Sequence, residues 1–264
     1  METKIHPSAI IEKGAELDSG VEVGPFCLIG ENVKIAKNTK LLSHVVIDGH
    51  TTIGEGNTIY SFASIGRPPQ DLSYKGEPTQ TVIGDNNVFR EYISVHRGTL
   101  KDKGITKIGS NSLFMAYVHF AHDTQIGDKL VIANACNIAG HVKIDDRVII
   151  GGGTNISQFI SIGRGAYIGG GSGIDRDIPH FCTAYGNRIK LKGINIIGLK
   201  RQGFERDEIS ELVDFHRTME ASAYSPKAFI SKPEIIEMYG KNQLVKMFSD
   251  FIKESEIGIA PFMS

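Results

Sequence analysis

Residues 5–65 read IHPSAIIEKGAELDSGVEVGPFCLIGENVKIAKNTKLLSHVVIDGHTTIGEGNTIYSFASI, and every sixth residue from Ile5 to Ile65 is Ile, Leu or Val. The same six-residue repeat returns over residues 83–95 and again over residues 108–174. Neither the 3.6-residue period of a helix nor the two-residue period of an ordinary strand produces this spacing. A hexapeptide repeat with many glycines is typical of a β-helix, so the sequence predicts a solenoid of short parallel strands.

A second position of the repeat supports this fold. The residue four places after each repeated aliphatic is small or β-branched in most hexads, as at Ala9, Ala15, Val21, Cys27, Val33, Thr39, Val45, Thr51 and Ala63. We expect both positions to point inward. Each hexad then forms one flat side and one corner, and three sides close a coil of about eighteen residues. Residues eighteen apart should therefore stack at about the 4.8 Å spacing of paired strands.

Glycine often follows the repeated aliphatic directly, at positions 24, 30, 54, 66, 84, 109, 127, 151, 163 and 169. We interpret these glycines as corner residues, where a side chain would strain the backbone.

Composition narrows the class of protein. The chain has 264 residues, 41% of them hydrophobic, and a net charge of −1. This balance gives no general attraction to nucleic acid, and no apolar stretch is long enough for stable membrane insertion. The beginning, METKIHPSAI, lacks the apolar core of a signal peptide, so we expect a cytoplasmic protein. Cys27 and Cys136 fall at the small inward position, which predicts buried thiols and no disulfide.

The chain divides into two predicted parts. Residues 1–186 form the β-helix domain, with the repeat interrupted near 66–82 and 100–107. Residues 187–264 form a C-terminal helical domain, because apolar residues there recur at helical spacing. These residues are Ile209, Leu212, Val213 and Met219, and later Leu244, Val245, Phe248, Phe251 and Ile252.

The segments HFAHD (119–123) and AGHV (139–142) hold the densest chemistry. Gly140 follows His122 by eighteen residues, and His141 follows Asp123 by eighteen, so all four should meet at one corner. An imidazole oriented by a carboxylate can act as a general base near neutral pH. A glycine beside it leaves a backbone N–H open to a developing oxyanion.

Other interpretations of the histidines remain open. Three histidines in neighbouring coils can also ligate zinc, which predicts a metal site instead of a base. The remaining histidines are interpreted as solvated surface side chains: His6, His44, His50, His96, His180 and His216.

Several longer stretches resemble the bacterial UDP-N-acetylglucosamine O-acyltransferases, which carry out the first step of lipid A synthesis. The resemblance runs from about residue 5 to about residue 262. The stretches are SHVVIDGH (43–50), FASIGRPPQDLSYKGEPT (62–79), SVHRGT (94–99), HFAHD (119–123), AGHV (139–142) and GINIIGLKRQGF (193–204).

The resemblance implies a left-handed parallel β-helix, assembled as a homotrimer with sites between subunits. The implied reaction moves a 3-hydroxyacyl group from acyl carrier protein to the glucosamine 3-hydroxyl of UDP-N-acetylglucosamine, with no metal or other cofactor. His122 would be the general base, Asp123 would orient its imidazole, and the Gly140 N–H would hold the oxyanion.

The same resemblance implies binding residues around that centre. Gln70 and Asp71 are expected to contact the sugar nucleotide, and Asn195 and Arg201 to contact its base and phosphates. His119 and His141 are also expected to bind substrate. The basic run from Arg188 to Arg201 fits a diphosphate or an acidic carrier protein. Gly170, in the second of two stacked triple-glycine runs, is expected to limit acyl-chain length.

The sequence also departs from the family pattern. Ser157 stands where the family usually has histidine, and Ser73 stands where some relatives have lysine. Acceptor identity therefore stays open, and a 3-amino UDP-sugar is one alternative.

Three alternatives of other kinds make different demands on the sequence. A zinc-dependent enzyme like a γ-class carbonic anhydrase would use the histidines as ligands. The pathway's N-acyltransferase carries an extra N-terminal domain, for which a repeat that begins at Ile5 leaves no room. A catalytically inactive structural trimer would not need His122, Asp123, Gly140 and His141 together.

Overall fold

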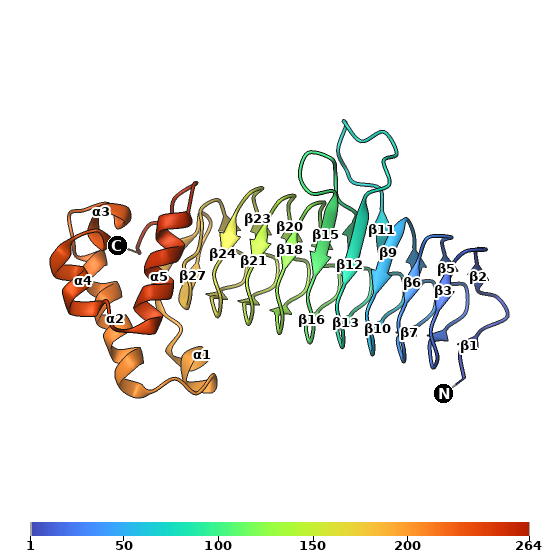
Figure 1. Ribbon diagram of the computed structural model, residues 1–264, viewed down its shortest axis with the longest axis horizontal. Helices are drawn as coiled ribbons and strands as arrows, with labels where there is room; N and C mark the ends of the chain where they lie inside the picture. Colours follow the sequence, from blue (N-terminus) through green and yellow to red (C-terminus); the bar gives the residue numbers. More distant parts are fainter. Residues whose placement is uncertain (1, 264) are drawn as a thin grey trace.

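The protein is a long stack of coils with a group of helices packed at one end (Figure 1). The computed structural model describes residues 2–263. Figure 1 places the N-terminus at the far end of the stack and the C-terminus among the helices. The two parts follow each other along one axis.

The strands within residues 2–263 form three sheets, named A, B and C in the order in which the chain first visits them. Sheet A contains β1 (Lys4–Ile5), β4 (Glu22–Val23), β7 (Lys40–Leu41), β10 (Thr58–Ile59), β13 (Val88–Phe89), β16 (Leu113–Phe114), β19 (Val131–Ile132), β22 (Ile149–Ile150), β25 (Tyr167–Ile168), β27 (Cys182–Tyr185) and β28 (Lys190–Ile194). Sheet B contains β2 (Ile10–Ile11), β5 (Leu28–Ile29), β8 (Val46–Ile47), β11 (Ser64–Arg67), β14 (Ser94–His96), β17 (His119–Phe120), β20 (Asn137–Ile138), β23 (Asn155–Ile156) and β26 (Gly173–Ile174). Sheet C contains β3 (Glu16–Leu17), β6 (Lys34–Ile35), β9 (His50–Ile53), β12 (Gln80–Ile83), β15 (Ile105–Ile108), β18 (Gln125–Ile126), β21 (Lys143–Ile144) and β24 (Ser161–Ile162).

Strand pairing confirms the predicted eighteen-residue coil. Val23 pairs with Leu41, and Phe120 pairs with Ile138, in parallel register. Each coil contributes one short strand to each sheet, and the next coil repeats the pattern one strand further along. The repeat predicts this parallel solenoid, and the left-handed β-helix is the form that the family resemblance implies.

The core is a column of stacked side chains inside the coils. The repeated aliphatics are buried from Val23 onward, and the small second position is buried at Val21, Cys27 and Val33. Ile5 is 46% exposed because no coil lies before the first one. A continuous apolar column of this kind is the main stabilising feature of a solenoid.

The glycines after the repeated aliphatics have a different role from the predicted one. Of the ten, Gly66 alone has a positive φ, at 77°. At Gly24 a Cβ would lie 2.7 Å from the Leu42 carbonyl oxygen, and at Gly127 it would lie 2.8 Å from the Asp146 amide nitrogen. These glycines are needed because neighbouring coils approach closely. The corner residue with a left-handed backbone usually lies two positions after the glycine, as at Phe26 and Lys129.

The two predicted interruptions are loops on the same corner, where the chain passes from sheet B to sheet C. Loop 1 comprises residues 68–79 and loop 2 comprises residues 97–104. Both project from the side of the stack (Figure 1). The loops increase the separation in sequence between paired residues beyond eighteen. Thr58 pairs with Val88, thirty residues later, and Ser94 pairs with His119, twenty-five residues later.

The C-terminal helices pack on one another and on the last strands. Within residues 2–263 they are α1 (Ile196–Arg201), α2 (Arg206–Glu220), α3 (Pro226–Ile230), α4 (Pro233–Tyr239) and α5 (Gln243–Glu254). The two predicted apolar stripes lie on α2 and α5, where Phe215 and Phe248 meet edge to face at 5.8 Å. The antiparallel strand β28 was not predicted, and it lies inside the segment predicted to be helical. Where the two domains divide stays a prediction.

Two histidines predicted to be solvated are buried, and a third, His180, is largely covered by Phe181 and Phe251, with its side chain 15% exposed. His96 lies under the loops of the B–C corner, and His216 lies on the inner face of α2 against Phe248 and Phe262. The prediction was wrong because the loops and the helix packing cover positions that the repeat alone leaves outside. No helix within residues 2–263 has the length and apolarity to span a bilayer.

Candidate active site

The B–C corner holds the candidate site. Strand β17 ends at Phe120 and β20 ends at Ile138, and the corner segments that follow them stack directly. His122 lies over Gly140, and Asp123 lies over His141, as the eighteen-residue spacing predicts. Loops 1 and 2 leave the same corner in the two preceding coils, so they border the site.

His122 and Asp123 form a buried hydrogen-bonded pair. The His122 Nδ1 lies 2.9 Å from the Asp123 Oδ2, and the side chains are 7% and 1% exposed. A carboxylate at that position accepts a hydrogen bond from Nδ1–H, so Nε2 is left as the basic nitrogen. Asp123 has φ 61°, a left-handed conformation that Asp tolerates better than most residues.

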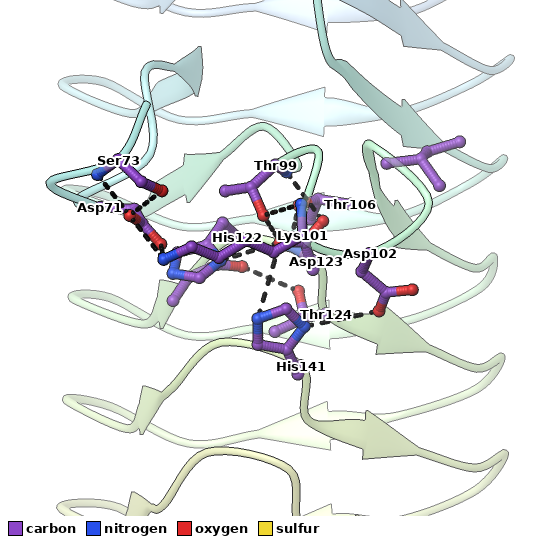
Figure 2. A network of polar contacts seen from close by, with 12 residues as sticks. Asp71, Ser73, Thr99, Lys101, Asp102, Thr106, His122, Asp123, Thr124 and His141 are labelled. Atoms are coloured by element: carbon purple, nitrogen blue, oxygen red, sulfur yellow. Dashed lines mark hydrogen bonds and ion pairs between the residues drawn. The ribbon is translucent and has the colours of Figure 1, made fainter. Parts of the chain in front are cut away.

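Loop 2 holds the Asp123 carboxylate in place (Figure 2). The Thr99 amide donates to Oδ1 at 2.8 Å, and the Thr99 hydroxyl donates to Oδ2 at 2.6 Å. Burial alone would raise the pKa of Asp123, but hydrogen bonds from His122 and Thr99 outweigh it and leave the pKa below its usual range. The carboxylate is therefore ionised at neutral pH and fixed toward His122.

Gly140 lies against the face of the His122 ring. A Cβ at Gly140 would lie 2.7 Å from Cε1 and 3.0 Å from Nε2 of His122. In the part of the chain that the structure describes, the Gly140 amide donates no hydrogen bond. A free N–H thus lies next to the imidazole that would take a proton.

His141 forms the lower edge of the site. Its ring stacks on Phe159 with centroids 4.6 Å apart, and its Nδ1 lies 3.4 Å from the Asp102 Oδ2. Its Nε2 lies 3.9 Å from the Asp123 Oδ2. A groove of about 580 Å³ opens beside His141 and continues toward Phe159.

His119 and His96 lie on the outer face of sheet B, next to the corner. The His119 Nδ1 lies 2.7 Å from the Ser94 Oγ, and the two imidazole rings meet edge to face at 4.9 Å. Burial and the neighbouring His119 and His122 lower the pKa of His96 to about 4, and burial and His122 also lower the pKa of His119. His96 is therefore neutral at pH 7.

Among the described residues, one group of three could hold a metal ion by distance: His122, Asp123 and His141, with ligand atoms within 4.8 Å of one another. Both Asp123 oxygens already accept hydrogen bonds from Thr99 or His122. This group contains two histidines, so the three-histidine zinc site that the sequence left open does not form within residues 2–263 of a single chain. The hydrogen bonding favours a base and its orienting carboxylate.

Loop 1 brings Asp71 to the edge of the site, while Gln70 is exposed beside it. The Lys101 Nζ lies 2.7 and 3.0 Å from the two Asp71 carboxylate oxygens. The amide and hydroxyl of Ser73 also donate to Oδ1. Lys101 and Ser73 hold the pKa of Asp71 well below its usual range.

Three predicted site residues lie elsewhere in this chain. Gly170 is exposed on the corner between sheets A and B. Asn195 caps α1, accepting from the Gly198 amide and donating to the Gly165 carbonyl on the corner between sheets C and A. Arg201 is exposed at the end of α1. A single chain thus distributes the predicted residues over all three corners.

Sequence reasoning missed Thr99, Lys101 and Asp102. The eighteen-residue rule cannot place them, because loop 2 inserts seven residues between β14 and β17. One available signal was the interruption itself, since a loop on a rigid scaffold often contributes to a site. For Thr99 a second signal was its place at the end of the family-like stretch SVHRGT.

Thr99→Val is expected to lower turnover about tenfold, since a hydrogen bond to a charged group contributes about 1.5 kcal/mol or more. The substitution removes the hydroxyl donor to Asp123 and keeps the side-chain shape. Initial rates measured at saturating substrates test this. Thr99→Ser, which keeps the hydroxyl donor, should turn over at a rate close to that of the unmodified protein. Equal rates for both variants and the unmodified protein would contradict a role for the Thr99 hydroxyl in orienting Asp123.

Comparisons with known proteins give the family. Residues 177–260 match the family model described as UDP-N-acetylglucosamine O-acyltransferase, domain 2. LpxA from Acinetobacter baumannii is 42% identical, with a TM-score of 0.91, over 97% of this chain and 99% of that one. LpxA from Moraxella catarrhalis is 41% identical, with a TM-score of 0.93, over the same shares.

A third solved structure agrees with these two. The UDP-N-acetylglucosamine acyltransferase of Francisella novicida is 37% identical, with a TM-score of 0.93, over 97% of this chain and 94% of that one. Identity at this level across nearly the whole of each chain covers the β-helix, both loops and the helical end. This chain belongs to the UDP-N-acetylglucosamine O-acyltransferase family.

Proposed function

We propose that this protein transfers a 3-hydroxyacyl group from acyl carrier protein to the 3-hydroxyl of UDP-N-acetylglucosamine, the first step of lipid A synthesis. The observation that carries the proposal is the His122–Asp123 pair stacked on the free amide of Gly140. Relatives named for this acyltransferase activity, similar over nearly their full length, support the substrate class.

The geometry supports a general-base mechanism. The His122 Nε2 takes the proton of the sugar 3-hydroxyl while that oxygen attacks the thioester carbonyl. The Gly140 N–H donates to the oxyanion of the tetrahedral intermediate, and Asp123 stabilises the imidazolium. Collapse of the intermediate breaks the carbon–sulfur bond, and the proton passes from His122 to the leaving thiolate.

A homotrimer with sites between subunits is part of the proposal. Gly170, Asn195 and the His122 pair lie on three different corners of one chain, so no single copy gathers them. A neighbour that presents its A–B or C–A corner to the B–C corner of this chain would complete the set. The mass of the native assembly in solution tests this. A cytoplasmic location stays a prediction.

The function is tested by incubating the purified protein with acyl carrier protein thioesters of different chain lengths and identifying the products by mass. UDP-N-acetylglucosamine and its 3-amino analogue should be offered side by side, because Ser157 leaves the acceptor open. An acylated UDP-sugar supports the proposal. If no combination of acyl donor and sugar acceptor gives a product, the proposal is refuted. Metal content measured on the same sample tests the zinc alternative.

Gly170→Met is expected to shift preference toward shorter acyl donors. Gly170 faces outward one coil below Gly152, and a long side chain there would cover the smooth strip that these glycines form. Each methylene that loses its contact costs about 0.8 kcal/mol, or about fourfold in kcat/KM. Competition between donors of different length measures the shift. An unchanged order of donors, with the acceptor KM also unchanged, would contradict the chain-length role.

A further inference from the structure

Loop 2 contacts three predicted site residues within four positions. Thr99 binds the Asp123 carboxylate, Lys101 binds the Asp71 carboxylate, and Asp102 approaches the His141 imidazole (Figure 2). These contacts join the catalytic pair to loop 1. Among them, the Lys101–Asp71 ion pair connects two side chains that come from different loops.

The ion pair is not needed to hold the loops together. Arg97 of loop 2 already donates from Nε to the Tyr74 hydroxyl of loop 1 at 2.9 Å, and from Nη1 to the Gly66 carbonyl at 3.0 Å. Its guanidinium carbon also lies 5.5 Å from the centre of the Tyr74 ring. The loops therefore remain connected without Lys101.

The Asp71 carboxylate needs the ion pair for its hydrogen bonding much more than the Lys101 ammonium group does. The Asp71 side chain is 11% exposed, while that of Lys101 is 54% exposed and keeps a third ammonium donor free. Without the ammonium group, the Asp71 carboxylate would keep only the two donors of Ser73, both on Oδ1. Oδ2 would then lose its only partner within residues 2–263.

The negative charge at the B–C corner also indicates a role for Lys101 in binding the acceptor. Asp71, Asp102 and Asp123 put three carboxylates at this corner, and a sugar nucleotide brings a negatively charged diphosphate to it. Like charges in a partly buried site disfavour binding, and a cation paired with one carboxylate lowers that repulsion. Lys101 is the cation that contacts a site carboxylate directly.

We propose that Lys101 is a positioning residue for the acceptor, because its ammonium group fixes and neutralises the Asp71 carboxylate that receives the sugar nucleotide. This inference rests on the proposed function. It assigns Lys101 to acceptor binding and leaves proton transfer at His122 unchanged. A loss of Lys101 should therefore appear in the acceptor KM and not in kcat.

The test compares Lys101→Met with Lys103→Met, which removes the same charge from an exposed neighbour in the same loop. We expect Lys101→Met to raise the KM for UDP-N-acetylglucosamine about tenfold with kcat within about twofold. Lys103→Met should leave both constants unchanged, and Lys101→Arg should restore most of the affinity. Calorimetric binding of UDP-N-acetylglucosamine should follow the same order.

A double-mutant cycle with Asp71→Asn decides whether Lys101 acts through Asp71. We expect the double variant Lys101→Met/Asp71→Asn to bind no more weakly than Asp71→Asn alone. Additive losses would overturn the inference, as would an unchanged KM in Lys101→Met or an equal loss in Lys103→Met. An unmodified protein without turnover would instead refute the proposed function, so the two failures are distinguishable.

Discussion

His122→Ala is expected to lower turnover by about 10²–10⁴-fold, the contribution that a positioned general base usually makes. The substitution removes the nitrogen that takes the proton of the sugar hydroxyl. It leaves Asp123 with both hydrogen bonds from Thr99, so no buried carboxylate loses all its partners. The β-helix core does not involve His122, because its side chain lies on the corner and not in the inner column.

The measurement is single-turnover acyl transfer together with thermal unfolding of the same sample. His44→Ala is the control, since that imidazole lies on the A–B corner, stacked on Phe62 and tilted against Phe26. We expect the control to keep its turnover. Turnover close to that of the unmodified protein in His122→Ala would remove the proposed base, whereas a large loss of unfolding temperature would show that the variant fails for structural reasons.

The sequence is sufficient to predict those parts of the site that lie between two uninterrupted coils. His122 and Gly140 are separated by one complete coil, so counting eighteen residues along the chain is enough to place them together. The same counting fails across loops 1 and 2, which add twelve and seven residues to their coils. Asp71 and Lys101 therefore meet through loop conformation, which no periodic pattern encodes.

In the fold, too, the sequence predicts the elements that follow a repeated pattern and misses those that depend on contacts with distant segments. Repeated aliphatics predicted the coils, and helical spacing predicted α2 and α5, because each pattern reflects one buried face. Strand β28 has five residues, three of them lysine or glycine, and it forms because β27 offers an antiparallel edge. The burial of His96 and His216 likewise depends on distant segments that cover them.

Gly140→Ala is expected to lower turnover by about 10²-fold through His122 and not through the oxyanion. Alanine keeps the backbone N–H, and Gly140 does not have a positive φ, so the backbone accepts the new side chain. The added methyl would lie 2.7 Å from the His122 Cε1 and 3.0 Å from its Nε2. The imidazole must move away, and a displacement of about 1 Å can cost about 10²-fold in rate.

The double variant His122→Ala/Gly140→Ala separates this effect from a direct one. If the methyl acts only by displacing the imidazole, the double variant should be no slower than His122→Ala alone, because the base is already gone. A further loss in the double variant would mean that the methyl blocks the substrate or the oxyanion itself. Full activity in Gly140→Ala would mean that the ring is free to move without loss, and the stacked arrangement of His122 on Gly140 would then not matter for catalysis.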